Sequence, residues 1–71
     1  MTGYVISRDR ADATTEFVGT VGAYPITVAS LADAKAFADR RAAVRLLHRE
    51  GLHLVGWRVE NARRYREAVQ S

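Results

Sequence analysis

The sequence predicts an α+β domain in which a small antiparallel sheet carries one main amphipathic helix, followed by a short C-terminal helix. Three observations indicate this fold class. Short runs rich in β-branched and aromatic residues lie within residues 4–28, an amphipathic segment covers residues 40–50, and apolar residues alternate along residues 52–60. The expected order is therefore β-β-(β)-α-β-α. A chain of 71 residues has room for one domain, over residues 1–71.

The first three elements are expected to be strands. Tyr4–Ser7 and Thr15–Val18 are short apolar or β-branched runs separated by a polar connection, and the simplest arrangement pairs them as an antiparallel hairpin. Tyr24–Val28 is a third candidate strand, with alternate residues on one face. Because Pro25 has no N–H to donate, this strand should be short or lie at the edge of the sheet.

The segment over residues 31–50 has helical spacing but contains two start signals. Ser30 and Asp39 can each cap a helix N-terminus, and Gly51 is a stop signal. One interpretation is a single helix over residues 31–50. We favour the other, in which a short helical turn precedes a longer helix and the chain breaks near Ala38 and Asp39.

The longer helix is expected to bury an aliphatic side and to expose a basic one. At about 100° per residue, the two kinds of side chain fall on opposite sides of the helix. The aliphatic side comprises Ala43, Val44, Leu46 and Leu47, and the basic side comprises Arg41, Arg45 and Arg49, with His48 beside them.

The remaining residues predict a strand and a final helix. Leu52–Glu60 alternates apolar and polar residues, which indicates a strand at the centre of the sheet and under the helix. Asn61 can cap the final helix. If that helix packs beside the first, the basic surface would be extended by Arg63, Arg64 and Arg66.

The composition predicts a cytoplasmic protein. The chain has no cysteine, no signal-peptide pattern, and no apolar run near the roughly 20 residues that a bilayer crossing requires. We therefore expect no disulfides and no contact with membranes. Because so short a chain has a thin core, a homodimer is a further expectation.

The net charge of +3 is unevenly distributed. Residues 37–71 contain eight of the eleven basic residues but only four of the eight acidic ones. All but one of the basic residues are arginine, whose planar guanidinium suits bidentate contact with carboxylate or phosphate. A GC-rich coding sequence or a solvated helix face would produce the same pattern, so the charge alone does not identify a site.

The sequence lacks the patterns of catalytic or metal sites. His48 and His53 flank Gly51 without the spacing of a metal-binding helix, and Asp9 and Asp12 lie in an expected loop. We therefore expect neither enzyme activity nor a metal or cofactor.

The glycine pair in Gly19-x-x-Gly22 is best explained as a turn. Its spacing is too short for a phosphate-binding loop, and both flanks are extended rather than helical. Tyr24 follows this turn and precedes Pro25. It is the aromatic residue that we expect to be exposed at a binding surface.

Several short motifs resemble those of a loose group of small proteins encoded by phages and other mobile elements. The motifs are Tyr4-Val5-Ile6, Ala34-Lys35-Ala36-Phe37, Ala42-Ala43-Val44 and Gly56-Trp57-Arg58-Val59-Glu60, and the resemblance covers residues 3–60. These are core-packing motifs, so the resemblance implies a fold and transfers no functional residue. It also implies a stoichiometric inhibitor of host machinery, as anti-CRISPR proteins are. Because this chain is basic, such an inhibitor would occlude a protein surface rather than imitate nucleic acid.

Two functional hypotheses follow. The first is a non-enzymatic protein of phage or mobile-element origin that binds an acidic surface of a host protein through Arg41, Arg45, Arg49 and adjacent residues. The alternative is a small nucleic-acid-binding protein that places the same side chains on phosphates. We favour the first because the element order matches no common nucleic-acid-binding fold and lysine is almost absent. A structural subunit, which would form a stable oligomer, is a third hypothesis.

Overall fold

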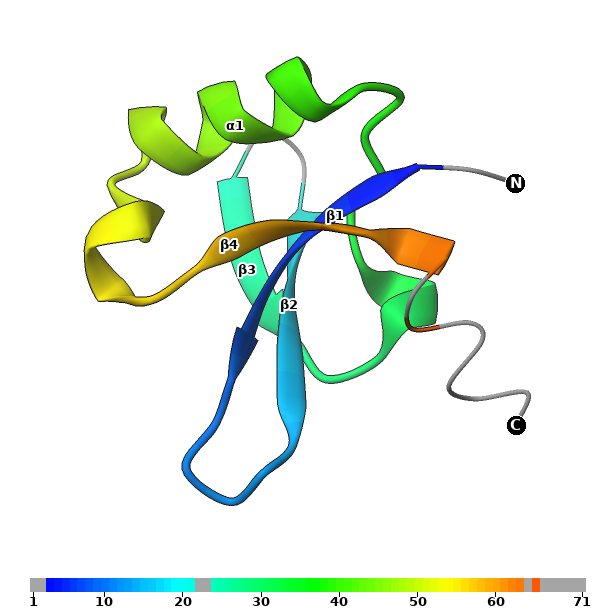
Figure 1. Ribbon diagram of the computed structural model, residues 1–71, viewed down its shortest axis with the longest axis vertical. Helices are drawn as coiled ribbons and strands as arrows, with labels where there is room; N and C mark the ends of the chain where they lie inside the picture. The colour runs from blue at the N-terminus through cyan, green and yellow to red at the C-terminus, as the bar shows by residue number, and fades with distance from the viewer. Residues whose placement is uncertain (1–2, 22–23, 64, 66–71) are drawn as a thin grey trace.

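Four strands form an antiparallel sheet in the order β3-β2-β1-β4 within residues 3–21, 24–63 and 65, which are the residues that the computed structural model describes (Figure 1). The strands are β1 (Tyr4–Asp9), β2 (Thr15–Val21), β3 (Tyr24–Val28) and β4 (Arg58–Asn61), the helix is α1 (Arg40–Arg49), and the two 3-10 turns are η1 (Leu31–Asp33) and η2 (Leu52–Val55). The predicted α+β class is confirmed. The third strand is also confirmed, and it lies at an edge of the sheet, as Pro25 requires.

The two faces of the sheet carry separate hydrophobic clusters, because successive residues of a strand point to opposite sides. We call the side covered by α1 the helix face and the other side the open face. The buried residues are Ile6, Val18, Ala43, Leu47 and Trp57 on the helix face, and Val5, Phe17 and Ala62 on the open face. On the helix face, α1 packs mainly on β1 and β4. The β2–β3 half of that face is therefore left partly uncovered.

The connection from η1 to α1 passes through the sheet between β1 and β2. These strands pair near the first hairpin and then diverge. In the opening, the backbone N–H of Lys35 donates to the carbonyl of Val18 at 2.9 Å, and Phe37 exchanges two backbone hydrogen bonds of 2.8 and 2.9 Å with Tyr4. Ala34 packs in the open-face cluster, whereas Phe37 packs in the helix-face cluster. Residues 34–37, which we call the crossing segment, thus carry the chain from one face to the other.

The crossing segment explains why residues 31–50 are not one helix. The 3-10 turn η1 begins after Ser30, whose hydroxyl accepts from Ala32 N at 3.2 Å, and it ends at Asp33. The chain is then extended until Asp39, whose carboxylate accepts from Ala42 N at 2.8 Å and caps α1. A single helix over residues 31–50 is therefore wrong, and the predicted start of the longer helix at Asp39 is confirmed. The preceding helical turn was expected to reach Phe37 but ends at Asp33, so the break begins earlier than predicted.

The predicted strand over Leu52–Glu60 is wrong in its first half and in its place in the sheet. Gly51 and Gly56 adopt left-handed backbone conformations, with φ of 67° and 91°, and they enclose the 3-10 turn η2. Such angles are readily accessible to glycine and interrupt an extended chain. The strand β4 therefore begins only at Arg58, and within the described residues it pairs with β1 alone, at the sheet edge.

The chain turns helical again at Ala62, and the predicted cap at Asn61 is confirmed. The Asn61 side-chain carbonyl accepts a hydrogen bond from Arg63 N at 2.9 Å. Ala62 is buried on the open face, and Tyr65 meets Phe17 edge-on, with ring centroids 5.0 Å apart and ring planes at 89°. This segment therefore starts on the side of the sheet opposite α1. The later part of the predicted helix lies outside the described residues.

We expect Gly19→Ala to lower the free energy of unfolding by about 1–3 kcal/mol, because the site is too tightly packed for a methyl group. A Cβ here would lie 2.9 Å from Val28 Cγ1 and 3.0 Å from the backbone oxygen of Asp33. Urea denaturation followed by tryptophan fluorescence measures the change. Gly3→Ala is the matched control, since its Cβ would stand 3.4 Å from the nearest backbone oxygen. Equal losses at both positions would contradict this packing argument.

Candidate functional site

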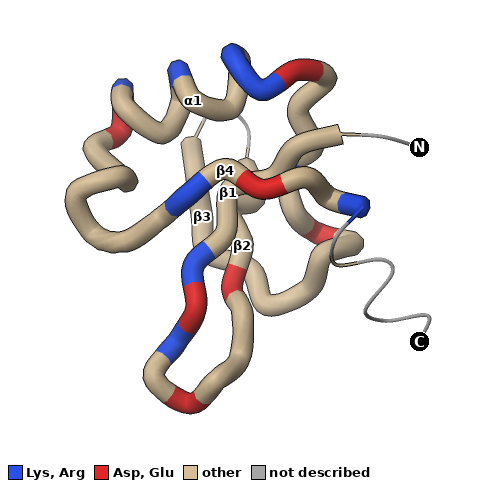
Figure 2. The backbone as a smooth tube through the Cα atoms, viewed as in Figure 1, with Lys and Arg blue, Asp and Glu red and all other residues tan. Residues whose placement is uncertain are grey.

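The side of α1 that points away from the sheet carries exposed arginines on successive turns (Figure 2). Arg41, Arg45 and Arg49 are all exposed, while Ala43 and Leu47 are buried beneath the helix. The predicted exposed row is therefore present. A rise of about 1.5 Å per residue separates successive members by roughly 6 Å along the helix axis. We call these three residues the arginine row.

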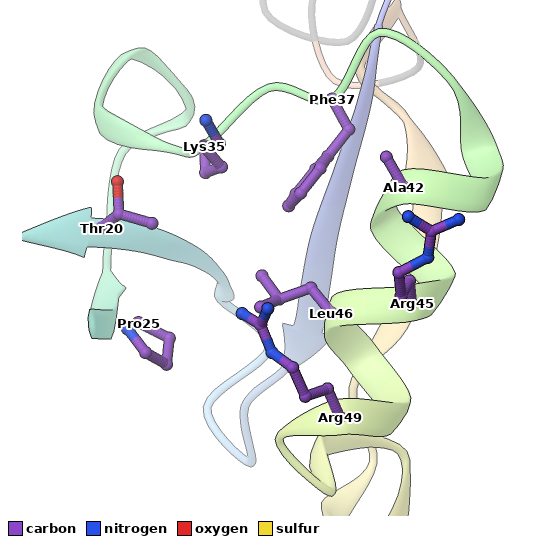
Figure 3. Close-up of a pocket in the computed structure, with 8 residues that line it drawn as sticks. All are labelled: Thr20, Pro25, Lys35, Phe37, Ala42, Arg45, Leu46 and Arg49. Atoms are coloured by element: carbon purple, nitrogen blue, oxygen red, sulfur yellow. The ribbon is translucent and has the colours of Figure 1, made fainter. Parts of the chain in front are cut away.

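A cleft of about 330 Å³ lies between α1 and the hairpin of β2 and β3 (Figure 3). It forms because α1 packs mainly on β1 and β4 and leaves the other half of the sheet partly uncovered. Its wall and floor are apolar, and its cations come from two separate segments. The lining residues are Thr20, Pro25, Lys35, Phe37, Ala42, Arg45, Leu46 and Arg49.

The cations surround the apolar part of this cleft, which we call the cationic cleft. Figure 3 shows Arg49 extending alongside Leu46 toward Pro25, with Lys35 on the side of the crossing segment. The Lys35 ammonium lies 5.8 Å from the centroid of the Phe37 ring. Among the lining residues there is positive charge and apolar surface but no carboxylate and no imidazole. This lining is suited to holding an anion that carries an apolar group.

A second hollow of about 340 Å³ adjoins the first along α1. Arg40, Arg41, Val44 and Arg45 line it. Arg45 lines both hollows, so it joins them into one basic surface. Two members of the arginine row therefore face the cationic cleft, and the third faces the neighbouring hollow.

Charges on the sheet are neutralised locally. Glu16 is buried, and its carboxylate accepts from Arg8 Nε at 2.9 Å and lies 3.8 Å from Arg10 Nε. The Arg8 guanidinium also stacks 4.6 Å from the centre of the Trp57 ring. These contacts tie the arginines of β1 and of the first hairpin to the core.

Arg58 on β4 is paired in the same way. Its Nε donates to Glu60 at 2.7 Å and its Nη2 to Asp9 at 3.2 Å. The hydrogen bond to Glu60, and to a lesser degree the contact with Asp9, raises the pKa of Arg58 above its ordinary value. This guanidinium is therefore part of the folded sheet rather than available to a ligand.

The cations around the helix are paired weakly or not at all. Arg49 lies 3.4 Å from Glu50, an exposed neighbour in sequence. Within the described part of the chain, the carboxylates form their ion pairs with Arg8, Arg10, Arg49 and Arg58, and none pairs with Lys35, Arg41 or Arg45. The cationic cleft therefore carries positive charge that few carboxylates of the described residues compensate.

The other predicted site residues do not gather at the cleft. His48 is exposed, and its ring lies against that of His53 in η2, with 4.3 Å between centroids and a tilt of 44°. No group of three or more metal-ligating side chains occurs in residues 3–21, 24–63 and 65. Tyr24 is exposed as expected, but the β2–β3 register places it on the open face, because it and Pro25 point to opposite sides.

Arg63 does not extend the arginine row, contrary to expectation. The segment that carries it begins with Ala62 and continues to Tyr65, and both pack with the open-face cluster, on the side of the sheet opposite α1. Arg64 and Arg66 lie outside the described residues. The expected continuous basic surface across two helices is thus wrong for Arg63.

Lys35 and Phe37 were not among the predicted site residues, because the helical spacing of the sequence places them in or near a helical segment. In an extended chain, residues two apart point to the same side, and this brings the only lysine of the sequence beside an aromatic ring. The pattern Lys35-x-Phe37 would have indicated this, had the break in the helix been placed earlier.

Comparison with known proteins provides no relative. The chain matches no protein-family model, no curated protein and no solved structure at a significant level. The resemblance to small proteins of phages and mobile elements therefore stays a prediction. Within the described residues, no helix has the length and apolar character needed to span a membrane.

We expect the cations of the cleft to contribute little to stability. Arg45→Ala should change the free energy of unfolding by no more than about 0.5 kcal/mol, because Arg45 is exposed and unpaired and its removal relieves repulsion within the arginine row. By contrast, Arg8→Ala leaves the buried Glu16 carboxylate without its closest partner and should cost about 1–3 kcal/mol. Thermal and urea denaturation of both variants measures the difference. A loss at Arg45 as large as that at Arg8 would mean that the row is structural.

Proposed function

We propose that this protein is a non-catalytic binding protein that engages an acidic surface of a partner protein through the cationic cleft and the arginine row. The observation that carries this proposal is that Lys35, Arg45 and Arg49 surround an apolar floor. Among these three cations, the ion pair found within the described residues is the surface contact of Arg49 with Glu50. An acidic side chain that enters the cleft would exchange water for charge-assisted hydrogen bonds. Its apolar neighbour would pack on Phe37 and Leu46.

The spacing of the charges favours a polypeptide ligand. Alternate side chains of an extended strand repeat every 6.8 Å or so, close to the roughly 6 Å rise between members of the arginine row. An extended acidic segment lying along α1 would therefore meet successive guanidinium groups. The near-exclusive use of arginine fits planar, bidentate contact with carboxylates.

The two parts of the surface have different roles in this proposal. The exposed arginine row acts before contact. Its positive charge increases the rate of encounter with an oppositely charged partner, and this effect decreases as the salt concentration rises. The cationic cleft acts at contact, because its cations lie beside apolar side chains that a bound segment can cover. Arg45 and Arg49 belong to both parts. Arg41, which does not line the cleft, should therefore affect the association rate more than the affinity.

A direct test uses a fluorescein-labelled peptide with glutamate at alternate positions and one leucine in the middle of the glutamate series. Fluorescence anisotropy at low salt should detect binding, and Arg45→Glu should weaken it at least about tenfold, as close charge pairs at interfaces do. Arg63→Glu is the charge-matched control. It changes the net charge equally on the other side of the sheet, and it should alter the affinity by no more than about twofold.

The same titrations with single-stranded and duplex oligonucleotides distinguish the nucleic-acid alternative. A phosphate-binding protein would bind both, with an affinity that falls by nearly one logarithmic unit per contacted phosphate for each tenfold rise in salt. Tighter binding to an oligonucleotide than to the peptide, controlled by the same arginines, would replace the proposed partner with a nucleic acid. Absence of peptide binding at low salt would overturn the proposal.

A further inference from the structure

The open face of the β2–β3 hairpin exposes a group of large apolar side chains. Val21, Tyr24 and Ile26 have exposed fractions of 62, 77 and 40%. In the register of the hairpin, Val21 pairs with Tyr24 and Gly19 with Ile26, and paired residues point to the same side of a sheet. The three side chains therefore form one surface, which we call the hairpin patch.

The hairpin patch lies in the part of the chain that has no charge. No acidic or basic residue occurs between Glu16 and Asp33, although 27% of the whole sequence is charged. The cationic cleft is on the other side of the same hairpin, where Thr20 and Pro25 line it. A neutral apolar surface and a basic surface are thus held back to back by one pair of strands.

We infer that the hairpin patch is the contact surface of a symmetric homodimer. A chain of net charge +3 repels its own copies, and the hairpin is where two copies can approach without bringing like charges together. Packing of the two patches around a twofold axis buries identical apolar side chains on both subunits. It also leaves α1 and the arginine row of each subunit on the outside. The inference is independent of the proposed partner, because it uses the opposite face of the sheet.

The geometry of β3 favours face-to-face packing over extension of the sheet. β3 is an edge strand, but its second residue, Pro25, has no N–H to donate to a neighbouring strand. Stacked sheets pack about 10 Å apart, a distance that side chains such as tyrosine and isoleucine fill from both sides. Each subunit has a total accessible surface of 4953 Å². Since stable dimers bury about 800 Å² per subunit and the patch has three large side chains, we expect dissociation at roughly 1–100 µM.

Sedimentation velocity over a concentration series from about 0.5 to 500 µM, spanning that range, tests this inference. The mass should rise from 7.9 kDa toward twice that value. The double variant Tyr24→Arg/Ile26→Arg should remain monomeric throughout while keeping the circular dichroism spectrum of the parent, because both side chains are exposed. A parent chain that is monomeric at the highest concentration would overturn the inference.

Control variants separate the hairpin patch from general effects of added charge. Thr27→Arg adds one positive charge to the same strand but on the helix face, and Leu54→Arg adds one in η2, where the side chain is 78% exposed; the double variant Thr27→Arg/Leu54→Arg matches the two charges of the test variant. All three should dimerise as the parent does. Loss of the dimer in Leu54→Arg, with retention in the Tyr24→Arg/Ile26→Arg variant, would place the interface elsewhere and overturn the inference.

A second measurement detects the dimer directly and requires no variant that disrupts it. The chain has no cysteine, so Tyr24→Cys introduces a single thiol for a spin label. Dipolar broadening between labels should appear at high concentration and vanish on dilution with unlabelled protein. A label at Thr27→Cys should show weaker broadening, because it lies on the other side of the strand. Equal broadening at both positions would count against the proposed face. Peptide binding by the cationic cleft does not depend on any of these outcomes.

Discussion

The divergence of β1 from β2 and the filling of that opening by the crossing segment determine most of this structure. If the register of β1 and β2 continued, Val18 would face Ile6 and Tyr4 would face Thr20. Instead, the backbone groups of Tyr4 and Val18 bond to Phe37 and Lys35. Unpaired buried backbone groups are costly, so the opening and the segment that fills it stabilise one another. The direction of the crossing then fixes η1 on the open face and α1 on the helix face. The cleft exists because α1 enters at the β1 side and covers only that half of the sheet.

Charge is distributed in two distinct ways across the same small domain. On the sheet, Arg8 and Arg58 are bound by carboxylates of neighbouring strands, Glu16 and Asp9, and act as structural cross-links between strands. Around α1, the cations are exposed or line hollows, and in the described residues they find few partners. Like charges at four-residue spacing destabilise a helix by a few tenths of a kcal/mol per pair. An arrangement with this cost is what one expects where binding, rather than folding, determines the residue type.

Local signals in the sequence were sufficient for much of the fold. Asp39 and Gly51 indicate the limits of α1 correctly because capping depends on residues within one turn. Pro25 indicates an edge strand because it lacks a donor. The exposed arginine row also follows from local spacing. None of these features requires knowledge of the tertiary contacts.

The errors arise where distant contacts decide the outcome. The alternation over residues 52–60 is real, but the left-handed backbones of Gly51 and Gly56 turn its first half into η2. The cationic cleft could not be predicted because Lys35 is held beside it by a contact between residues distant in the sequence. In this contact, the backbone N–H of Lys35 donates to the carbonyl of Val18. The position of Arg63 depended on which face of the sheet the final segment covers. That face is set by the packing of Ala62 and Tyr65 with Phe17, and the helical pattern is the same for both faces.

Lys35 is the only lysine in the sequence, so the side chains of this protein offer a single primary amine, and that amine lines the cationic cleft. Amine-selective chemistry on a side chain is therefore also site-selective. Acylation of this nitrogen removes one positive charge beside Phe37 while every guanidinium is left intact. A fluorophore attached there would report on the occupancy of the cleft without any change to the sequence.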